Sequence, residues 1–177
     1  GDFDGDGDPD LVVANLNQPV RLYRNDHGQD LVVVWSSAET ADSRSVAWGD
    51  YDGDGDLDLA VGNNNAPSRV YRNDAGALTL AWSTAGEPTR SMAWGDYDGD
   101  GWLDLAVAND GAPSRVYHND GGALSLAWST PGSAATERVA WGDYDGDGRL
   151  DLALGNEYAP SEMYHNAGSR CTLGLAR

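Results

Sequence analysis

Short apolar runs recur along the whole chain and are separated by polar or glycine-containing turns. The second unit shows the pattern most clearly, with runs at 45–50, 57–63, 68–73 and 77–83 (SVAWGD, LDLAVGN, SRVYRN and ALTLAWS). These runs are rich in valine, leucine, alanine and aromatic residues, and no segment keeps a helical period over ten or more residues. The pattern therefore predicts four short β-strands in each unit and an all-β chain.

The same unit is repeated along the sequence. A nine-residue motif, DYDGDGDLD in the second unit, starts at Asp2, Asp50, Asp96 and Asp143, which gives spacings of 48, 46 and 47 residues. Four strands in a unit of this length are typical of a β-propeller blade, whose faces are buried by the neighbouring blades. We therefore expect a single array of four blades, at residues 1–44, 45–90, 91–137 and 138–177.

The first unit is incomplete. It has no counterpart of the run that precedes the motif in the other units, so the chain supplies about fifteen strands rather than sixteen. A propeller protects its edges only when the ring of blades closes. We therefore expect a partial propeller, an open arc that requires further blades or a second copy of the chain to close a ring.

The repeated motif has the composition of a calcium loop. Acids stand at positions 1, 3, 5 and 9, and glycine at position 6 allows the sharp turn that brings their oxygens together. Calcium takes six to eight oxygen ligands, and position 7, which varies, would supply only its backbone carbonyl. The sequence therefore predicts up to four calcium ions. The predicted ligands are Asp2, Asp4, Asp6, Asp8, Asp10, Asp50, Asp52, Asp54, Asp56, Asp58, Asp96, Asp98, Asp100, Trp102, Asp104, Asp143, Asp145, Asp147, Arg149 and Asp151, with Asp8, Asp56, Trp102 and Arg149 acting through the carbonyl.

Two other interpretations of the motif are weaker. A single acidic loop could simply be a solvated surface turn, but four copies with every ligand-position acid present favour a metal. An EF-hand requires an acid at position 12 and a following helix. Position 12 is instead valine or leucine inside a β-rich run, at Val13, Val61, Val107 and Leu154. The EF-hand interpretation is therefore excluded.

The net charge has the same origin as the motif. The chain of 177 residues carries a formal charge of −18, and the four motifs hold 18 of its 29 acids, while the remaining 11 are balanced by 11 arginines. Nucleic acid is excluded as a partner, because phosphate binding requires a basic surface. No apolar run reaches the length needed to cross a membrane, so no membrane insertion is expected. Loops of this kind match the millimolar calcium outside cells, which predicts a secreted or cell-surface protein.

Other candidate chemistry is weak. The tryptophans at repeated positions could form a sugar-stacking platform, but core packing is the favoured interpretation, and only Trp102 is expected to be exposed. His118 and His165 occupy the position that arginine fills in earlier units, which indicates surface groups at strand ends. The paired acids belong to the motifs, the serines lack a nucleophile elbow, and Cys171 has no histidine nearby. We therefore expect no catalytic residue and no enzyme activity.

By these repeated motifs, the chain resembles the FG-GAP or VCBS-type repeats of integrin-α-like, calcium-binding β-propellers. Trp48-Gly49, Trp94-Gly95 and Trp141-Gly142 stand where the family has Phe-Gly. Gly111-Ala112-Pro113 is intact, and two other units keep Ala-Pro. The resemblance implies a calcium-bearing propeller, usually of seven blades, that binds proteins or glycans outside the cell. In such families the metal is largely structural.

The turns predict where a partner would bind. Consecutive hairpins alternate between two rims, so the motifs lie on one rim, and the second-to-third turns and the linkers between blades lie on the other. That second rim varies from unit to unit, either because it binds a partner or because its loops are unconstrained. The predicted ligand-binding residues are Asn63, Asn64, Asn65, Asn109, Asp110, Glu157, Tyr158, Arg44, Arg90 and Arg138.

The favoured function is a non-catalytic segment for adhesion or recognition of an extracellular protein or glycan. Two alternatives stay open at this stage. One is an accessory propeller of a larger secreted enzyme, and the other is a structural spacer in a large surface protein. Fold alone does not decide between them.

Overall fold

The computed structural model describes residues 1–28, 30–168 and 173–176, which contain fifteen β-strands and no helix. The strands form four antiparallel sheets, which we name blades 1 to 4. Blade 1 consists of β1 (Leu11–Val13), β2 (Arg21–Arg24) and β3 (Val32–Ser36). Blade 2 consists of β4 (Asp42–Gly49), β5 (Asp58–Asn64), β6 (Arg69–Asp74) and β7 (Ala77–Ser83).

The last two blades repeat the four-stranded arrangement. Blade 3 consists of β8 (Thr89–Gly95), β9 (Asp104–Asn109), β10 (Arg115–Asn119) and β11 (Leu124–Ser129). Blade 4 consists of β12 (Thr136–Gly142), β13 (Asp151–Asn156), β14 (Glu162–Asn166) and β15 (Leu173–Leu175). Each blade is a simple meander in which every strand pairs with the next one along the chain. Short hairpin turns suffice for this order, which is why each unit fits in fewer than fifty residues.

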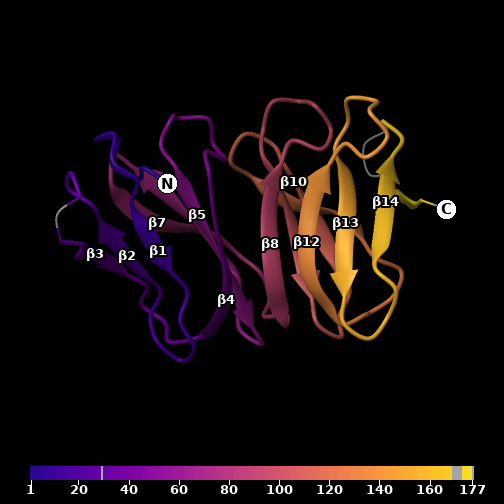
Figure 1. The fold of residues 1–177 in the computed structure, drawn as a ribbon, viewed down its shortest axis with the longest axis horizontal. Helices are drawn as coiled ribbons and strands as arrows, with labels where there is room; N and C mark the ends of the chain where they lie inside the picture. The colour runs from indigo at the N-terminus through magenta and orange to yellow at the C-terminus, as the bar shows by residue number, and fades with distance from the viewer. Residues whose placement is uncertain (29, 169–172, 177) are drawn as a thin grey trace.

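The four blades stand side by side in chain order, with the first and last at opposite ends of an open row (Figure 1). This confirms the predicted all-β partial propeller, including the three-stranded first blade. The opening strands of blades 2, 3 and 4 begin slightly before the expected boundaries, because β4, β8 and β12 take in the last linker residues.

Register shifts recur at two places in the blades. One lies between the first two strands, at Ser43/Ser45, Thr89/Ser91 and Thr136/Arg138. The other lies between the last two strands of blades 1 to 3, at Leu22/Tyr23, Val70/Tyr71 and Val116/Tyr117. A β-bulge bends its strand and increases the local twist. The repetition shows that successive blades share not only strand order but also the detailed shape of the sheet.

The hydrophobic core is divided into three clusters, each lying between two adjacent blades. Between blades 2 and 3 the cluster includes Val70 and Leu105, which are fully buried, together with Met92 and Tyr117. Similar clusters join blade 1 to blade 2 and blade 3 to blade 4. Since no blade has a core of its own, each one depends for stability on its neighbours.

The Trp-Gly pair at the end of each first strand interlocks neighbouring blades. Trp94 of blade 3 lies against Gly49 of blade 2, where an added Cβ would be 2.7 Å from the indole. Trp141 of blade 4 lies against Gly95 in the same way, at 2.5 Å. A side chain at either glycine would therefore displace the next blade's tryptophan. Gly142, at the outer face of blade 4, has no described atom within 4 Å of that position.

The tryptophans of the last strands of blades 1 to 3 pack against tyrosines of the following blade. The ring centroids of Trp35 and Tyr71 are 4.9 Å apart in an edge-to-face arrangement. Two further pairs repeat this contact, Trp82 with Tyr117 at 4.7 Å and Trp128 with Tyr164 at 4.8 Å. This geometry is favourable for aromatic rings. The repeated tryptophans thus lie between blades, as the core-packing interpretation predicted.

Candidate metal centres

The four acidic motifs lie along one edge of the row of blades, which we call the motif rim. Each motif in blades 2 to 4 connects the first strand to the second, and β8 and β12 run upward in Figure 1 into these loops. The linkers between blades and the second-to-third turns lie on the opposite edge, which we call the linker rim. This arrangement follows directly from the meander order of the strands.

The acid at position 1 shapes its own loop. In blade 2, Asp50 accepts hydrogen bonds from the backbone N–H of Gly53 (2.8 Å) and Gly55 (3.1 Å), one to each carboxylate oxygen. Asp2, Asp96 and Asp143 accept the corresponding bonds in the other blades. Both glycines have positive φ angles, 73° and 96°, which favours glycine at these positions. The loop is therefore folded into shape by its first acid.

The acid at position 9 is buried and anchors the loop to the blade. Asp58 is 0% exposed, and its two oxygens accept the N–H groups of Tyr51 (2.9 Å) and Asn73 (2.8 Å). Asp104 and Asp151 make the same two bonds in blades 3 and 4. Burial raises the pKa of Asp58 and of Asp104 to about 6, even though these hydrogen bonds oppose the shift. A nearby cation would offset the cost of burying these carboxylates.

The remaining acids of each motif bring further carboxylate oxygens close to those at positions 1 and 9. Asp4 and Asp52, at position 3, each have one buried carboxylate oxygen without a hydrogen-bond partner among the described residues. Burial, followed by repulsion from neighbouring acids, raises the pKa of both groups. Three-residue groups whose ligand atoms lie within 4.8 Å of one another are Asp2, Asp4 and Asp6; Asp50, Asp52 and Asp58; and Asp96, Asp98 and Asp100. Converging hard oxygens of this kind fit a divalent cation such as calcium.

Position 7 has a role that its variability did not suggest. Asp56 accepts a hydrogen bond from the N–H of Ala75 at 2.8 Å, and Asp8 accepts one from His27 at the same distance. In blade 4, Arg149 instead donates to the carbonyl of Asn166 at 2.9 Å. These side chains hold the third-to-fourth turn against the motif. Coordination through their carbonyls stays a prediction.

Trp102 fills position 7 of the third motif and is half-buried, not exposed as expected. Its ring lies against the glycine turns on either side, since a Cβ added at Gly53 would be 2.6 Å from it and one at Gly121 3.4 Å. Gly53 belongs to the motif of blade 2. Trp102 therefore bridges two neighbouring motifs.

His118 and His165 lie beside the motifs, and sequence reasoning missed them. The side chain of His118 is only 16% exposed, and its Nδ1 is 3.2 Å from an oxygen of Asp104 and 3.4 Å from one of Asp98. The Nδ1 of His165 is 3.3 Å from oxygens of Asp145 and Asp151. The interpretation of His118 as a surface group was therefore wrong, because the strand end it occupies faces the motif, whereas the side chain of His165 is 34% exposed and lies at the edge of its motif. Each histidine could add a nitrogen ligand or a positive charge to its motif.

A repeated asparagine links each motif to the next one. The side-chain nitrogen of Asn119 donates to the carbonyls of Leu103, in its own blade, and Tyr51, in blade 2 (2.9 and 2.6 Å). Asn73 makes the same pair of bonds to Leu57 and Phe3, and Asn166 makes it to Leu150 and Tyr97. All three asparagines are buried. The sequence does contain a signal for this repeated contact, because every unit carries asparagine after Tyr-Arg or Tyr-His.

On the linker rim, two of the predicted ligand-binding residues face the interior. Asn63 is 0% exposed and Asn109 is 1% exposed. Each donates its side-chain N–H to the carbonyl of a turn proline, Pro67 or Pro113, at 2.7 Å. These two asparagines therefore hold the second-to-third turns and are not placed to contact a partner.

The other predicted residues of the linker rim lie closer to solvent. Arg90 pairs with Asp110 across blade 3 and lies 3.6 Å from Glu137. Arg44 and Asn64 both bond Asp42, and Asn65 has a φ of 58°. Arg138 donates to the carbonyl of Glu137, Glu157 is exposed, and Tyr158 is 84% exposed. Cys171 lies outside the described residues.

The family of the chain follows from the repeat itself. The FG-GAP-like repeat matches residues 2–61, 50–107 and 96–154, which together span most of the sequence. The chain belongs to the FG-GAP-like repeat family. Each matched segment contains the acidic motif and the Trp-Gly pair described above. No curated protein matches the chain.

Solved structures agree with the fold of this FG-GAP-like chain. It is similar to BBS1N in the crystal structure of BBS1N in complex with ARL6DN, soaked with lead, with a TM-score of 0.65 and 14% sequence identity. The match covers 100% of the FG-GAP-like chain and 50% of the BBS1N chain, so the present sequence spans half the length of that structure. At this identity the likeness shows the propeller fold alone. No helix capable of crossing a membrane occurs in the part of the chain that the structure describes.

Proposed function

We propose that this chain is a non-catalytic, calcium-binding propeller segment of an extracellular protein. Calcium ions would hold the motif rim rigid, and the linker rim would bind a protein or glycan partner. The observation that carries the proposal is the convergence of carboxylates in the repeated motifs, with the buried position-9 acid at the centre of each loop. Further blades or a second copy of the chain would complete the ring.

Electrostatics supports a role for a cation in every motif. Three or four carboxylates within a few ångströms repel one another, and this repulsion is stronger beside the buried interior than in water. A divalent ion turns the repulsion into attraction. Because the linking asparagines join adjacent motifs through Tyr51 and its counterparts, order imposed on one loop would be passed to the next. Calcium would therefore stabilise the array as well as single loops.

The linker rim supports partner binding by its chemistry. It presents exposed Tyr158 and Glu157 beside partly exposed arginines and acids. Aromatic, guanidinium and carboxylate groups are suited to polar protein surfaces and to the hydroxyls of sugars. The rigid blades below would keep these loops at fixed spacing, which is how binding loops are commonly presented.

Calcium uptake tests the proposal directly. Chelator-treated protein titrated with calcium in a calorimeter should take up as many as four ions, and its melting temperature should rise with the calcium concentration. Asp100→Asn should reduce the number of ions bound, whereas Tyr158→Ala should leave it unchanged. No heat of calcium binding, together with melting that is indifferent to chelator, would refute the proposal.

A further inference from the structure

In blade 2, the space between the preceding linker and the third strand is filled by an ion-paired cluster. Glu39 of the linker lies 3.0 Å from the guanidinium of Arg69 at the start of β6. The other oxygen of Glu39 accepts a 2.6 Å hydrogen bond from the hydroxyl of Tyr71. Arginine, glutamate and tyrosine thus close the gap between blade and linker.

Blade 3 fills the same space with the same three residue types. Arg115, at the start of β10, pairs with the linker residue Glu87 and donates to the hydroxyl of Tyr117 at 3.4 Å. Burial alone would raise the pKa of Glu87, but hydrogen bonding from Thr84 and the charge of Arg115 lower it below its ordinary value. The guanidinium is therefore a stabilising part of this cluster.

Blade 4 departs from this arrangement at both charged positions. Glu162 stands at the start of β14, where β6 and β10 begin with arginine. Ala134 stands two residues before the threonine of β12, where Glu87 precedes the threonine of β8. The carboxylate stands on the blade instead of the linker, and neither of these two positions carries a cation. A small pocket remains, lined by Thr130, Pro131, Gly132, Ala134, Thr136, Glu162 and Tyr164.

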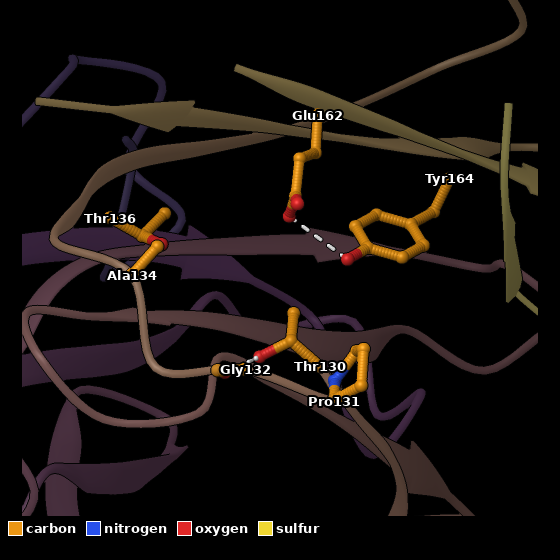
Figure 2. A pocket seen from close by; sticks show the side chains of 7 residues that line it. All are labelled: Thr130, Pro131, Gly132, Ala134, Thr136, Glu162 and Tyr164. Carbon is orange, nitrogen blue, oxygen red and sulfur yellow. Dashed lines mark hydrogen bonds between the residues drawn. The ribbon is translucent and has the colours of Figure 1, made fainter. Parts of the chain in front are cut away.

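The lining of this pocket is suited to a positively charged group. Figure 2 shows the carboxylate of Glu162 and the hydroxyl of Tyr164 pointing toward each other, with a 2.9 Å hydrogen bond between them. Burial, together with this bond and the charge of Glu162, raises the pKa of Tyr164 to about 12, so the hydroxyl stays protonated at neutral pH. No arginine or histidine among the described residues lies within ion-pair distance of Glu162.

The hydroxyl groups of the pocket also act as acceptors. Thr130 donates to the carbonyl of Gly132 at 2.7 Å, and Thr136 donates to the side-chain oxygen of Asn156 at 2.7 Å. Since both hydroxyl protons are engaged, the oxygens can only accept from a ligand, and the Thr130 oxygen, which already accepts the N–H of Ser114 at 3.0 Å, has one lone pair left. Pro131 and Ala134 form an apolar wall. A carboxylate, hydroxyl acceptors and an apolar wall match a flat group with several N–H donors.

We propose that this pocket binds the guanidinium group of an arginine side chain on a partner protein. The ligand chemistry is taken from blades 2 and 3, where the chain's own arginine occupies the corresponding place. A guanidinium fits better than an ammonium because its fork of N–H donors can reach the carboxylate and a hydroxyl at once. The pocket opens on the linker rim, so the inference rests on the proposed function and assigns one contact of its partner.

The test uses calcium-saturated protein and N-acetyl-arginine methylamide as the probe. Titration followed by ¹⁵N chemical shifts should perturb amides around the pocket at millimolar concentration. The citrulline analogue, which has the same shape without the charge, should bind at least about tenfold more weakly, since charge-assisted hydrogen bonds are the stronger ones. Equal binding of the two probes, or shifts that are absent from blade 4, would overturn the proposal.

Three variants sharpen the test. Glu162→Gln should weaken arginine binding about tenfold or more, whereas Asp120→Asn, which removes an exposed carboxylate beside the motif rim of blade 3, should leave it unchanged. The double variant Ala134→Glu/Glu162→Arg restores the pairing of blades 2 and 3. It should keep or raise the melting temperature and abolish binding. Equal losses in Glu162→Gln and Asp120→Asn, or undiminished binding by the double variant, would contradict the assignment.

Failure of this proposal is distinguishable from failure of the calcium proposal. Calcium uptake measured on the same samples reports on the motif rim, and the arginine probe reports only on the pocket of blade 4. Normal calcium uptake without arginine binding would refute the pocket alone. A neutral oligosaccharide that perturbs the pocket amides and displaces the arginine probe would assign the pocket to glycans and overturn the inference.

Discussion

On the motif rim the same hydrogen bonds recur from blade to blade, whereas on the linker rim the charged cluster of blade 4 departs from those of blades 2 and 3. Asn73, Asn119 and Asn166 each donate to one backbone carbonyl of their own motif and to one of the preceding motif. The linker clusters, by contrast, pair arginine with glutamate in blades 2 and 3, whereas in blade 4 the glutamate bonds a tyrosine and has no arginine partner among the residues that the structure describes.

The difference lies in what the side chains bind. A bond to a backbone group fixes the residue type, because the backbone partner is the same in every blade and is costly to leave unsatisfied when buried. A pair of side chains near solvent can be exchanged, inverted or lost at small cost. The asparagine contacts of the motif rim are therefore constrained by the blade itself, whereas the charged pairs of the linker rim are free to differ.

The largest effect should come from the centre of a motif. Asp104→Ala leaves the buried N–H groups of Tyr97 and Asn119 without an acceptor, and should lower the free energy of unfolding by about 3 kcal/mol in saturating calcium. Urea denaturation measures this loss of unfolding free energy. Asp110→Ala is the matched change on the linker rim and should cost about 1 kcal/mol or less. Equal costs would show that the two rims do not differ as described.

The contacts between blades should give the next effect. Gly95→Ala places a methyl group against Trp141 and should destabilise the protein by about 2 kcal/mol through overpacking. Gly142→Ala is the control at the outer face of blade 4, where the change should stay within about 0.5 kcal/mol. Thermal melting followed by near-UV circular dichroism compares the two. A Gly95→Ala variant as stable as the parent would mean that the tryptophan is not held tightly by its neighbour.

A charge exchange on the linker rim should have a smaller effect. Glu87→Ala/Arg115→Glu gives blade 3 the arrangement of blade 4 and should cost about 1 kcal/mol, because the ion pair it removes is partly exposed. The variant should also bind a second equivalent of the arginine probe. Loss of folding on this exchange would contradict the view that this rim tolerates inverted charges.

The smallest effect should be at the exposed tip of blade 4. Tyr158 is 84% exposed, so Tyr158→Ala should change the unfolding free energy by less than about 0.5 kcal/mol and leave calcium uptake intact. A pull-down or glycan array should nevertheless lose signal if the tyrosine contacts the partner. A large stability change would place Tyr158 in a structural role.

Much of the fold could be predicted from the sequence, because each strand follows from a local apolar run and each turn from glycine, proline or asparagine. Strand number, blade number and the short first blade were confirmed. The acids of the motifs were predicted as ligands, but the backbone bonds of Asp50 and Asp58 were not, since they depend on the folded loop. Calcium binding and localisation stay predictions.

The contacts that sequence reasoning missed depend on the register between strands or on the neighbouring blade. Asn73 reaches Phe3, seventy positions earlier, and only the stacking of blades brings the two together. Asn63 looks like a polar turn residue in the sequence, yet it is buried, because its side chain bonds the carbonyl of Pro67. His118 faces the motif because its strand ends beside Asp104. None of these could be read from hydropathy alone.

The glycine that receives each tryptophan has a consequence for how such a gene can change. Because Gly49 and Gly95 present the same socket, and each is filled by an indole from the next unit, one unit is interchangeable with another at its boundaries. An in-frame duplication or deletion of a whole unit would therefore join matching surfaces without new mutations. A change in the number of units would therefore leave this one contact between blades unaltered.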